Sequence, residues 1–182
     1  SNIHRQSLYD EKNINQSKVK AAKKKLNRIN SKTKINIFNF RLNQTKFEKI
    51  IKNYDYIVDG TDNFESKFLI SDLSLKYKKF LVTGAISKFD GHIFTFNFSN
   101  KKNPCLRCFY QQETISDDIL NCEYEGILGT VAGIVGTLQA NEVLKKILSI
   151  GKNLNGFILI LDLLNLSFRK AKINKRNKCK CK

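Results

Sequence analysis

The fold is decided by residues 54–87, which read YDYIVDGTDNFESKFLISDLSLKYKKFLVTGAIS. An apolar strand at 56–58 ends in Asp59, and Asp62 follows shortly before a segment with apolar side chains at helical spacing. A second β-rich run occupies 80–87. Strand, helix and strand in this order predict two parallel strands joined by a right-handed crossover. Because open α/β sheets bind ligands at the carboxyl ends of their strands, Asp59 and Asp62 are candidate site residues.

More elements are predicted on both sides of this stretch from their periodicity. Residues 45–53 place Phe47, Ile50 and Ile51 on one helical face, and residues 129–151 form a helix with small residues on one face and a glycine stop. The remaining predicted strands lie at 34–40, at 92–98 as an antiparallel edge, and at 156–164 and 167–173. We therefore expect an α/β fold with a Rossmann-like, mostly parallel sheet and an antiparallel C-terminal extension.

Composition and hydropathy favour a globular protein of the cytoplasm. The chain has 182 residues, of which 41% are hydrophobic, and this is enough for one domain with a substantial core. No apolar run approaches the roughly 18 residues of a membrane helix, and the first residues lack the apolar core of a signal peptide. We expect a cytoplasmic location and no membrane association. The chain contains no methionine, so we also expect it to be part of a longer protein.

The net charge of +17 raises the question of nucleic-acid binding. The lysines recur in almost every polar segment instead of forming one cluster, and they accompany heavy use of asparagine, isoleucine and phenylalanine. All four residue types have AT-rich codons, so codon bias explains the charge better than a selected polyanion-binding surface does. Nucleic acid is therefore not an expected partner.

The five cysteines are a more specific chemical feature. Cys105 and Cys108 form a CxxC pair whose thiolates can bind one tetrahedral Zn²⁺, and Cys179 and Cys181 can supply the other two ligands. A disulfide is the alternative, which a reducing cytoplasm disfavours. Cys122 stands alone in the polar segment LNCEYEGILG, where it is either a packed small side chain or an accessible thiol.

Seven blocks of the sequence follow the order of a known family. They are SNIHRQ (1–6), QSKVKAA (16–22), DGTDN (59–63), LVTGAI with FDGHIFTF (81–96), PCLRC (104–108), CEYEGILG (122–129) and GIVGTLQANEVLK (133–145). Together they resemble the ThiF, MoeB and HesA adenylyltransferases, relatives of the ubiquitin-activating enzymes, over essentially the whole chain. The resemblance implies one domain at 1–182. Within it, 1–98 would be the remainder of a nucleotide-binding sheet, 99–128 a cysteine-containing crossover loop, and 129–182 a helix plus the C-terminal strands.

The resemblance implies an enzyme that uses ATP and Mg²⁺ to adenylate the C-terminal glycine of a ubiquitin-like sulfur carrier protein, with release of pyrophosphate. The carrier would be ThiS- or MoaD-like and end in Gly-Gly, and the pathway would be thiamine or molybdenum-cofactor biosynthesis. A homodimer is implied for the full-length protein. The family's glycine-rich phosphate loop would precede Ser1, so we expect residues 1–182 alone to be inactive.

Individual site residues follow from the matching blocks. Asn2 and Arg5 correspond to contacts with phosphate and ribose, and Lys18 corresponds to a phosphate-binding lysine. Asp62 corresponds to the carboxylate that holds Mg²⁺ and faces the α-phosphate, with Asn63 beside it as a further cofactor contact. A carboxylate that attacks phosphorus meets charge repulsion, so the reaction needs cations more than it needs a general base.

Three residues are implied in catalysis: Arg5, Asp62, and Cys122 as a thiol that attacks the acyl-adenylate or takes part in sulfur transfer. Asp59 is given a supporting role. The spacing CKC at 179–181 departs from the family's usual second CxxC. The geometry of the fourth zinc ligand therefore does not follow from the resemblance, whereas that of the first pair does. Two other function classes stay open: a non-catalytic module that binds ubiquitin-like proteins, and a basic nucleic-acid-binding protein. A nicotinamide-dependent oxidoreductase would not explain the paired cysteines.

Overall fold

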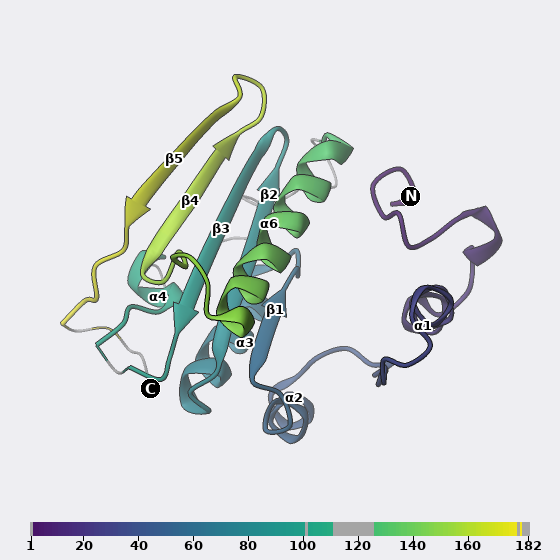
Figure 1. The fold of residues 1–182 in the computed structure, drawn as a ribbon, viewed down its shortest axis with the longest axis horizontal. Helices are drawn as coiled ribbons and strands as arrows, with labels where there is room; N and C mark the ends of the chain where they lie inside the picture. Colours follow the sequence, from purple (N-terminus) through teal and green to yellow (C-terminus); the bar gives the residue numbers. More distant parts are fainter. Residues whose placement is uncertain (1, 101, 111–125, 178, 180–182) are drawn as a thin grey trace. The chain divides into compact units, whose positions relative to one another are not determined.

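The computed structural model describes residues 2–100, 102–110, 126–177 and 179. The chain divides into two compact units, Ser1–Arg41 and Leu42–Lys182, which we call the N-terminal unit and the sheet unit. Figure 1 shows the course of the chain through its helices and strands. None of the helices in the described part of the chain is long and apolar enough to cross a lipid bilayer.

The N-terminal unit consists of turns and one long helix. A short 3-10 helix, η1 (Glu11–Asn13), precedes α1 (Lys18–Ile29). Ala21 is the buried residue of α1, and the side chain of Lys25 donates from Nζ to the backbone carbonyl of Ser7 at 2.5 Å. This bond ties the helix to the turns that precede it.

The strand expected at 34–40 is not formed, and that prediction is wrong. Ile35 and Ile37 are half-buried in the alternating pattern that suggested a strand, but the backbone pairs with no strand that the structure describes. Alternation becomes a strand only where a neighbour satisfies the backbone N–H and C=O groups. Phe38 and Phe40 contact each other instead, with ring centroids 5.9 Å apart.

The sheet unit is built on a five-stranded sheet in the order β1-β2-β3-β4-β5 (Figure 1). β1 (Tyr56–Asp59) and β2 (Phe80–Ser87) pair in parallel and are connected through α3 (Phe64–Lys76), which confirms the predicted strand, helix and strand. In this register Asp59 lies opposite Thr83. The carboxyl ends of the two parallel strands therefore lie at the same end of the sheet.

The rest of the sheet is antiparallel. β3 (Asp90–Asn97) pairs with both β2 and β4 (Phe157–Asp162), and β4 pairs with β5 (Ser167–Lys172). The expected α/β class and antiparallel C-terminal extension are thus confirmed, although the parallel part is smaller than expected because 34–40 does not enter the sheet. The edge position predicted for 92–98 is wrong, since β3 has a neighbouring strand on each side.

Helices cover both faces of the sheet, as Figure 1 shows for α3 and α6. Alternate residues of a strand point to opposite faces. Leu81 and Phe94 accordingly belong to the core under α2, α3 and α4, whereas Val82 and Ile93 belong to the core under α6. The predicted helices at 45–53 and 129–151 are confirmed in type. Among the described residues of this unit, the further helices are α2 (Gln44–Ile51), α4 (Leu106–Phe109) and α6 (Gly129–Leu148).

Two glycines allow α6 to lie close to the sheet. A Cβ atom at Gly84 of β2 would lie 2.6 Å from Oε1 of Gln139, and a Cβ atom at Gly91 of β3 would lie 2.5 Å from Cγ2 of Val135. The close approach brings the Gln139 amide to the strand ends, where its Nε2 donates to carbonyls of both β1 and β2, the former at Asp59 with a distance of 2.8 Å. One side chain of α6 therefore joins the two parallel strands.

We expect Gly91→Ala to destabilise the protein by about 1–3 kcal/mol, because the added methyl group would overlap Val135 and push α6 away from the sheet. Gly136→Ala is the matched control, since a Cβ atom at this helical glycine meets nothing within 4 Å. Alanine there should stabilise the helix by roughly 0.5–1 kcal/mol. The urea midpoints of the two variants should move in opposite directions, and a Gly91→Ala midpoint at or above the wild-type value would contradict the close packing.

Candidate functional site

Asp59, the last residue of β1, is buried and holds its neighbours in place. Its Oδ1 accepts hydrogen bonds from the backbone N–H of Thr61 at 2.8 Å and from the Thr61 hydroxyl at 2.7 Å. Its Oδ2 accepts from Nζ of Lys67 at 3.1 Å and from the hydroxyl of Thr83. Because Asp59 is only 1% exposed and both oxygens are engaged, its carboxylate is not accessible to a ligand.

Asp62 lies at the exposed end of the same loop, directly before α3. Asn63 is the N-cap of this helix: its Oδ1 accepts from the backbone N–H of Ser66 at 2.8 Å, and its Nδ2 donates to Oδ1 of Asp62 at 3.2 Å. The carboxyl ends of parallel strands and the positive end of a helix dipole both favour anionic ligands at this position. The structure thus presents an oriented, solvent-accessible carboxylate where α/β sheets bind ligands.

The residues assigned to the nucleotide lie partly in the other unit. The N-terminal unit holds a cavity of about 240 Å³ whose lining includes Asn2 and Lys18. Arg5 lies in the adjoining turn, where its backbone N–H donates to the carbonyl of Asn2 at 3.2 Å. Asp62 and Asn63 belong to the sheet unit. Within the N-terminal unit the structure brings Asn2, Arg5 and Lys18 together, and within the sheet unit it brings Asp62 and Asn63 together.

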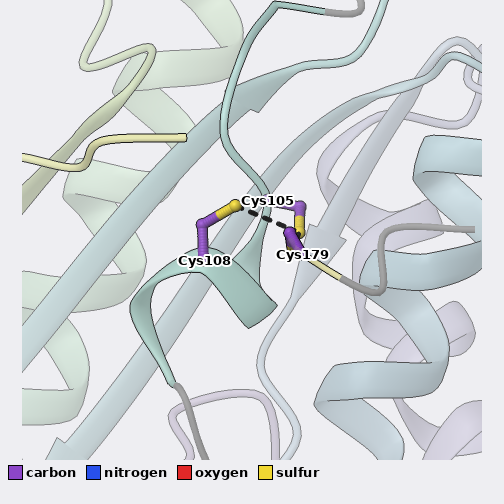
Figure 2. A group of neighbouring side chains, drawn as sticks. All are labelled: Cys105, Cys108 and Cys179. Carbon is purple, nitrogen blue, oxygen red and sulfur yellow. Dashed lines mark hydrogen bonds between the residues drawn. The ribbon is translucent and has the colours of Figure 1, made fainter. Parts of the chain in front are cut away.

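Three of the four predicted metal ligands converge (Figure 2). Cys105 is the N-cap of α4, Cys108 lies within α4, and Cys179 comes from the C-terminal segment. Their Sγ atoms lie within 4.8 Å of one another, and that of Cys105 is 3.8 Å from Cys108 and 3.7 Å from Cys179. A tetrahedral zinc with Zn–S bonds of about 2.3 Å holds its sulfurs roughly 3.8 Å apart, whereas a disulfide bond measures about 2.05 Å. The three thiols are not joined to one another by disulfides, and their spacing fits a metal ion.

The surroundings of Cys108 favour its thiolate form. Burial raises the pKa of Cys108, but hydrogen bonds with the backbone of Cys105 and Arg176 and with the neighbouring thiols outweigh it, so the net pKa lies below the usual value. The thiolate is the form that binds metals. Cys181, the predicted fourth ligand, lies outside the described residues, and so does Cys122.

Arg107, between the two cysteines of α4, connects the cluster to α3. Its guanidinium forms a bidentate ion pair with Asp72, in which Nη2 lies 2.8 Å from Oδ2. Hydrogen bonding to this carboxylate raises the pKa of Arg107. The Cζ atom also lies 4.4 Å from the ring centroid of Phe68. Asp72 and Phe68 both belong to α3, so the segment that carries Cys105 and Cys108 is fixed to the helix that begins after Asp62.

Sequence reasoning missed Lys67, which reaches the centre of the strand-end network. The signal was its position on α3: Lys67 lies between Phe64 and Phe68, on the face of the helix that forms the core. A lysine on such a face is almost never fully buried unless a partner compensates its charge. Asp59, at the end of the preceding strand, was the available partner.

The comparisons with known proteins agree with this architecture. A model of the family described as the ThiF family matches residues 1–182. A "Probable molybdopterin-synthase adenylyltransferase" of Gracilaria tenuistipitata var. liui is 38% identical over 177 residues, which cover 97% of this chain and 49% of that protein. A "Sulfur carrier protein adenylyltransferase" of Thermus thermophilus is 34% identical over 182 residues, which cover 98% of this chain and 67% of that protein.

Among solved structures, MccB of E. coli with ATP matches 99% of this chain and 54% of its own, with a TM-score of 0.83 and 16% sequence identity. At this identity the likeness shows a shared fold and nothing more. The chain spans about half the length of several curated relatives that it matches, such as 49% and 45% of two proteins from red algae.

Proposed function

Because the chain belongs to the ThiF family, which confirms the resemblance seen in its sequence, we propose that the protein containing it adenylates a ubiquitin-like sulfur carrier. ATP and Mg²⁺ would be used to activate the C-terminal glycine of a carrier that ends in Gly-Gly, in thiamine or molybdenum-cofactor biosynthesis. The observation that carries the proposal is Asp62, an exposed carboxylate oriented by Asn63 at the carboxyl end of a parallel strand. The names of the relatives support the same reaction class.

The chemistry is a substitution at the α-phosphorus of ATP. An oxygen of the carrier's terminal carboxylate forms a bond to this phosphorus, the bond to the β-phosphate oxygen breaks, and pyrophosphate leaves with the electron pair. Attacking group and phosphate are both anionic, so the site must supply positive charge at the point of reaction. Magnesium, when bound, supplies part of that charge. Asp62 would hold it, and no general base is needed because a terminal carboxylate is ionised at neutral pH.

The N-terminal unit would supply the remaining contacts with ATP. Asn2 and Lys18 share one cavity, and Arg5 lies in the adjoining turn. We assign Lys18 to the phosphates, and Asn2 and Arg5 to phosphate and ribose. Arg5 is also our candidate for stabilising the charge that develops during the substitution, since its guanidinium donates several hydrogen bonds to phosphate oxygens.

The cysteine cluster would have a structural role. We propose that Cys105, Cys108, Cys179 and Cys181 bind one Zn²⁺, because the three described sulfurs already have the separation of zinc ligands. We also retain 1–98 as part of the nucleotide-binding sheet, 99–128 as the crossover loop and 129–182 as the helix and last strands of one domain. A cytoplasmic homodimer is our proposal for the full-length protein.

Pyrophosphate exchange tests the proposed function. The full-length protein that contains this chain should exchange labelled pyrophosphate into ATP only when Mg²⁺ and a carrier ending in Gly-Gly are both present. A carrier that lacks the two terminal glycines is the matched control and should support no exchange. Carrier binding without exchange would favour a non-catalytic binding module, and exchange driven by free amino acids would point to another substrate class.

Cys122→Ser tests the proposed thiol role. If Cys122 acts after adenylation, the variant should keep normal pyrophosphate exchange and lose sulfur delivery to the carrier, because the first step needs no thiol. Both reactions are measured on the same preparation of full-length protein. Normal activity in both assays would leave Cys122 as a packing residue.

A further inference from the structure

Lys67 is a charged side chain inside an apolar core. Its side chain is 3% exposed, and its helical neighbours Phe64 and Phe68 are core residues. Moving an ammonium group out of water is unfavourable unless good partners compensate the loss of hydration. A lysine at this position therefore requires the particular partners that the structure provides.

Those partners lie at the carboxyl end of β1 and beside it on β2. Nζ of Lys67 lies 3.1 Å from Oδ2 of Asp59 on β1 and 2.5 Å from the carbonyl oxygen of Gly84 on β2. Lys67 itself belongs to the start of α3, and this helix begins directly after Asp62 and the N-cap residue Asn63. One ammonium group thus fixes the start of the helix to the end of β1 and to the neighbouring part of β2.

The same contacts fix the short loop between β1 and α3. Asp59 uses its other oxygen to hold the backbone N–H of Thr61 at 2.8 Å. Asn63 is fixed by its capping bond with Ser66 at 2.8 Å. Asp62 is the single residue between these two anchored positions. Its place therefore depends on the buried ion pair, although Asp62 itself is exposed.

We propose that Lys67 is a positioning residue, which sets the place of the Asp62 carboxylate for Mg²⁺ bound with ATP. The proposal rests on the proposed function, because that function gives Asp62 a cation to hold. Without the ammonium group, Asp59 becomes a buried anion without its cationic partner, and the start of α3 loses its hydrogen bond to the Gly84 carbonyl of β2. The expected consequence is weaker use of Mg²⁺, with carrier binding unaffected.

Lys67→Met tests this, because it removes the ammonium group and keeps a long unbranched side chain. In the full-length protein, the Mg²⁺ concentration for half-maximal pyrophosphate exchange should rise at least about tenfold, while the KM for the carrier stays within about twofold. Lys67→Arg keeps a cation and should restore most of the loss. Lys76→Met is the matched control, since Lys76 lies on the same helix and pairs with Glu48 at the surface. It should leave the Mg²⁺ dependence unchanged.

A double variant separates positioning from stability. Asp59→Asn with Lys67→Met removes both buried charges, so its thermal midpoint should exceed that of Lys67→Met, while its Mg²⁺ dependence stays impaired. If the double variant recovers both the thermal midpoint and the Mg²⁺ dependence, Lys67 serves only to compensate the charge of Asp59, and the proposal is overturned. An unchanged Mg²⁺ dependence in folded Lys67→Met would overturn it as well. If Lys67→Met does not fold, the double variant and Lys67→Arg decide the question.

Direct binding of Mn²⁺ with ATP, followed by electron paramagnetic resonance, gives a measurement that does not require adenylation. Weaker Mn²⁺ binding in Lys67→Met than in the wild-type protein supports the positioning role, even if the wild-type protein shows no carrier-dependent exchange. That absence would refute the proposed function alone. Equal Mn²⁺ binding in both proteins, together with normal carrier-dependent exchange, would refute the role of Lys67 alone.

Discussion

Replacing Asp62 with alanine is expected to lower carrier-dependent pyrophosphate exchange of the full-length protein by at least about 100-fold. The carboxylate is exposed at the end of β1 and oriented by Asn63, where it would hold the Mg²⁺ that reduces charge repulsion at the α-phosphate. Asp59 cannot replace it, because Asp59 is buried and both of its oxygens accept hydrogen bonds from neighbouring side chains. Initial rates at saturating ATP and carrier measure the loss.

Asp55→Ala is the matched control for this substitution. Asp55 is an exposed carboxylate just before the other end of the same strand, and its removal should leave exchange within about twofold of the wild-type rate. Thermal midpoints of both variants should stay near that of the wild-type protein, since substitutions at exposed positions usually change stability by less than about 0.5 kcal/mol. Equal exchange in the two variants would remove Asp62 from the mechanism.

The second large effect is expected at the cysteine cluster. Purified full-length protein should contain one zinc per chain at the proposed site, and the pair Cys105→Ser with Cys108→Ser should lose that metal. The thermal midpoint should fall by about 10 °C or more, because a structural zinc contributes several kcal/mol to folding. Elemental analysis and a thermal melt of the same samples measure both changes.

Cys122→Ser is the control for the metal, because this cysteine is not among the proposed ligands and its loss should leave the zinc content unchanged. Full retention of zinc in the double serine variant, or wild-type protein that binds none, would contradict the proposed site. The double serine variant should show a clear fall in thermal midpoint and only a smaller loss of pyrophosphate exchange. Arg107, which lies between Cys105 and Cys108, pairs with Asp72 of α3, whereas Asp62 pairs with Asn63 at the start of that helix.

The middle of the fold was predictable because several local signals agree there. In 54–87, apolar runs, polar breaks and helical spacing all point to the same elements, and β1, α3 and β2 have the expected places. Residues 34–40 show why the rest was harder. Their alternation is a local signal, whereas a strand exists only if a distant segment pairs with it. For 92–98 the strand was right and the edge position wrong, because its second neighbour, β4, comes from far along the chain.

The site was predictable where chemistry depends on spacing. The CxxC spacing places Cys105 and Cys108 together, and the block around Asp62 marks the end of β1. Lys67 could not be found in this way, because a helical lysine in a chain of net charge +17 is by default a solvated side chain. Its burial follows from how α3 packs on the strand ends, and that packing is a tertiary property.

The amide of Gln139 also sets an order of folding. It bonds the carbonyls of Asp59 and Val82, which precede it by 80 and 57 residues. Such contacts form late, because the entropy of closing a long loop is lost before the contact is gained. The hairpin of β2 and β3 needs only neighbouring residues. During synthesis, the end of β1 beside Asp62 is therefore expected to be completed only after α6 has left the ribosome and packed on the sheet.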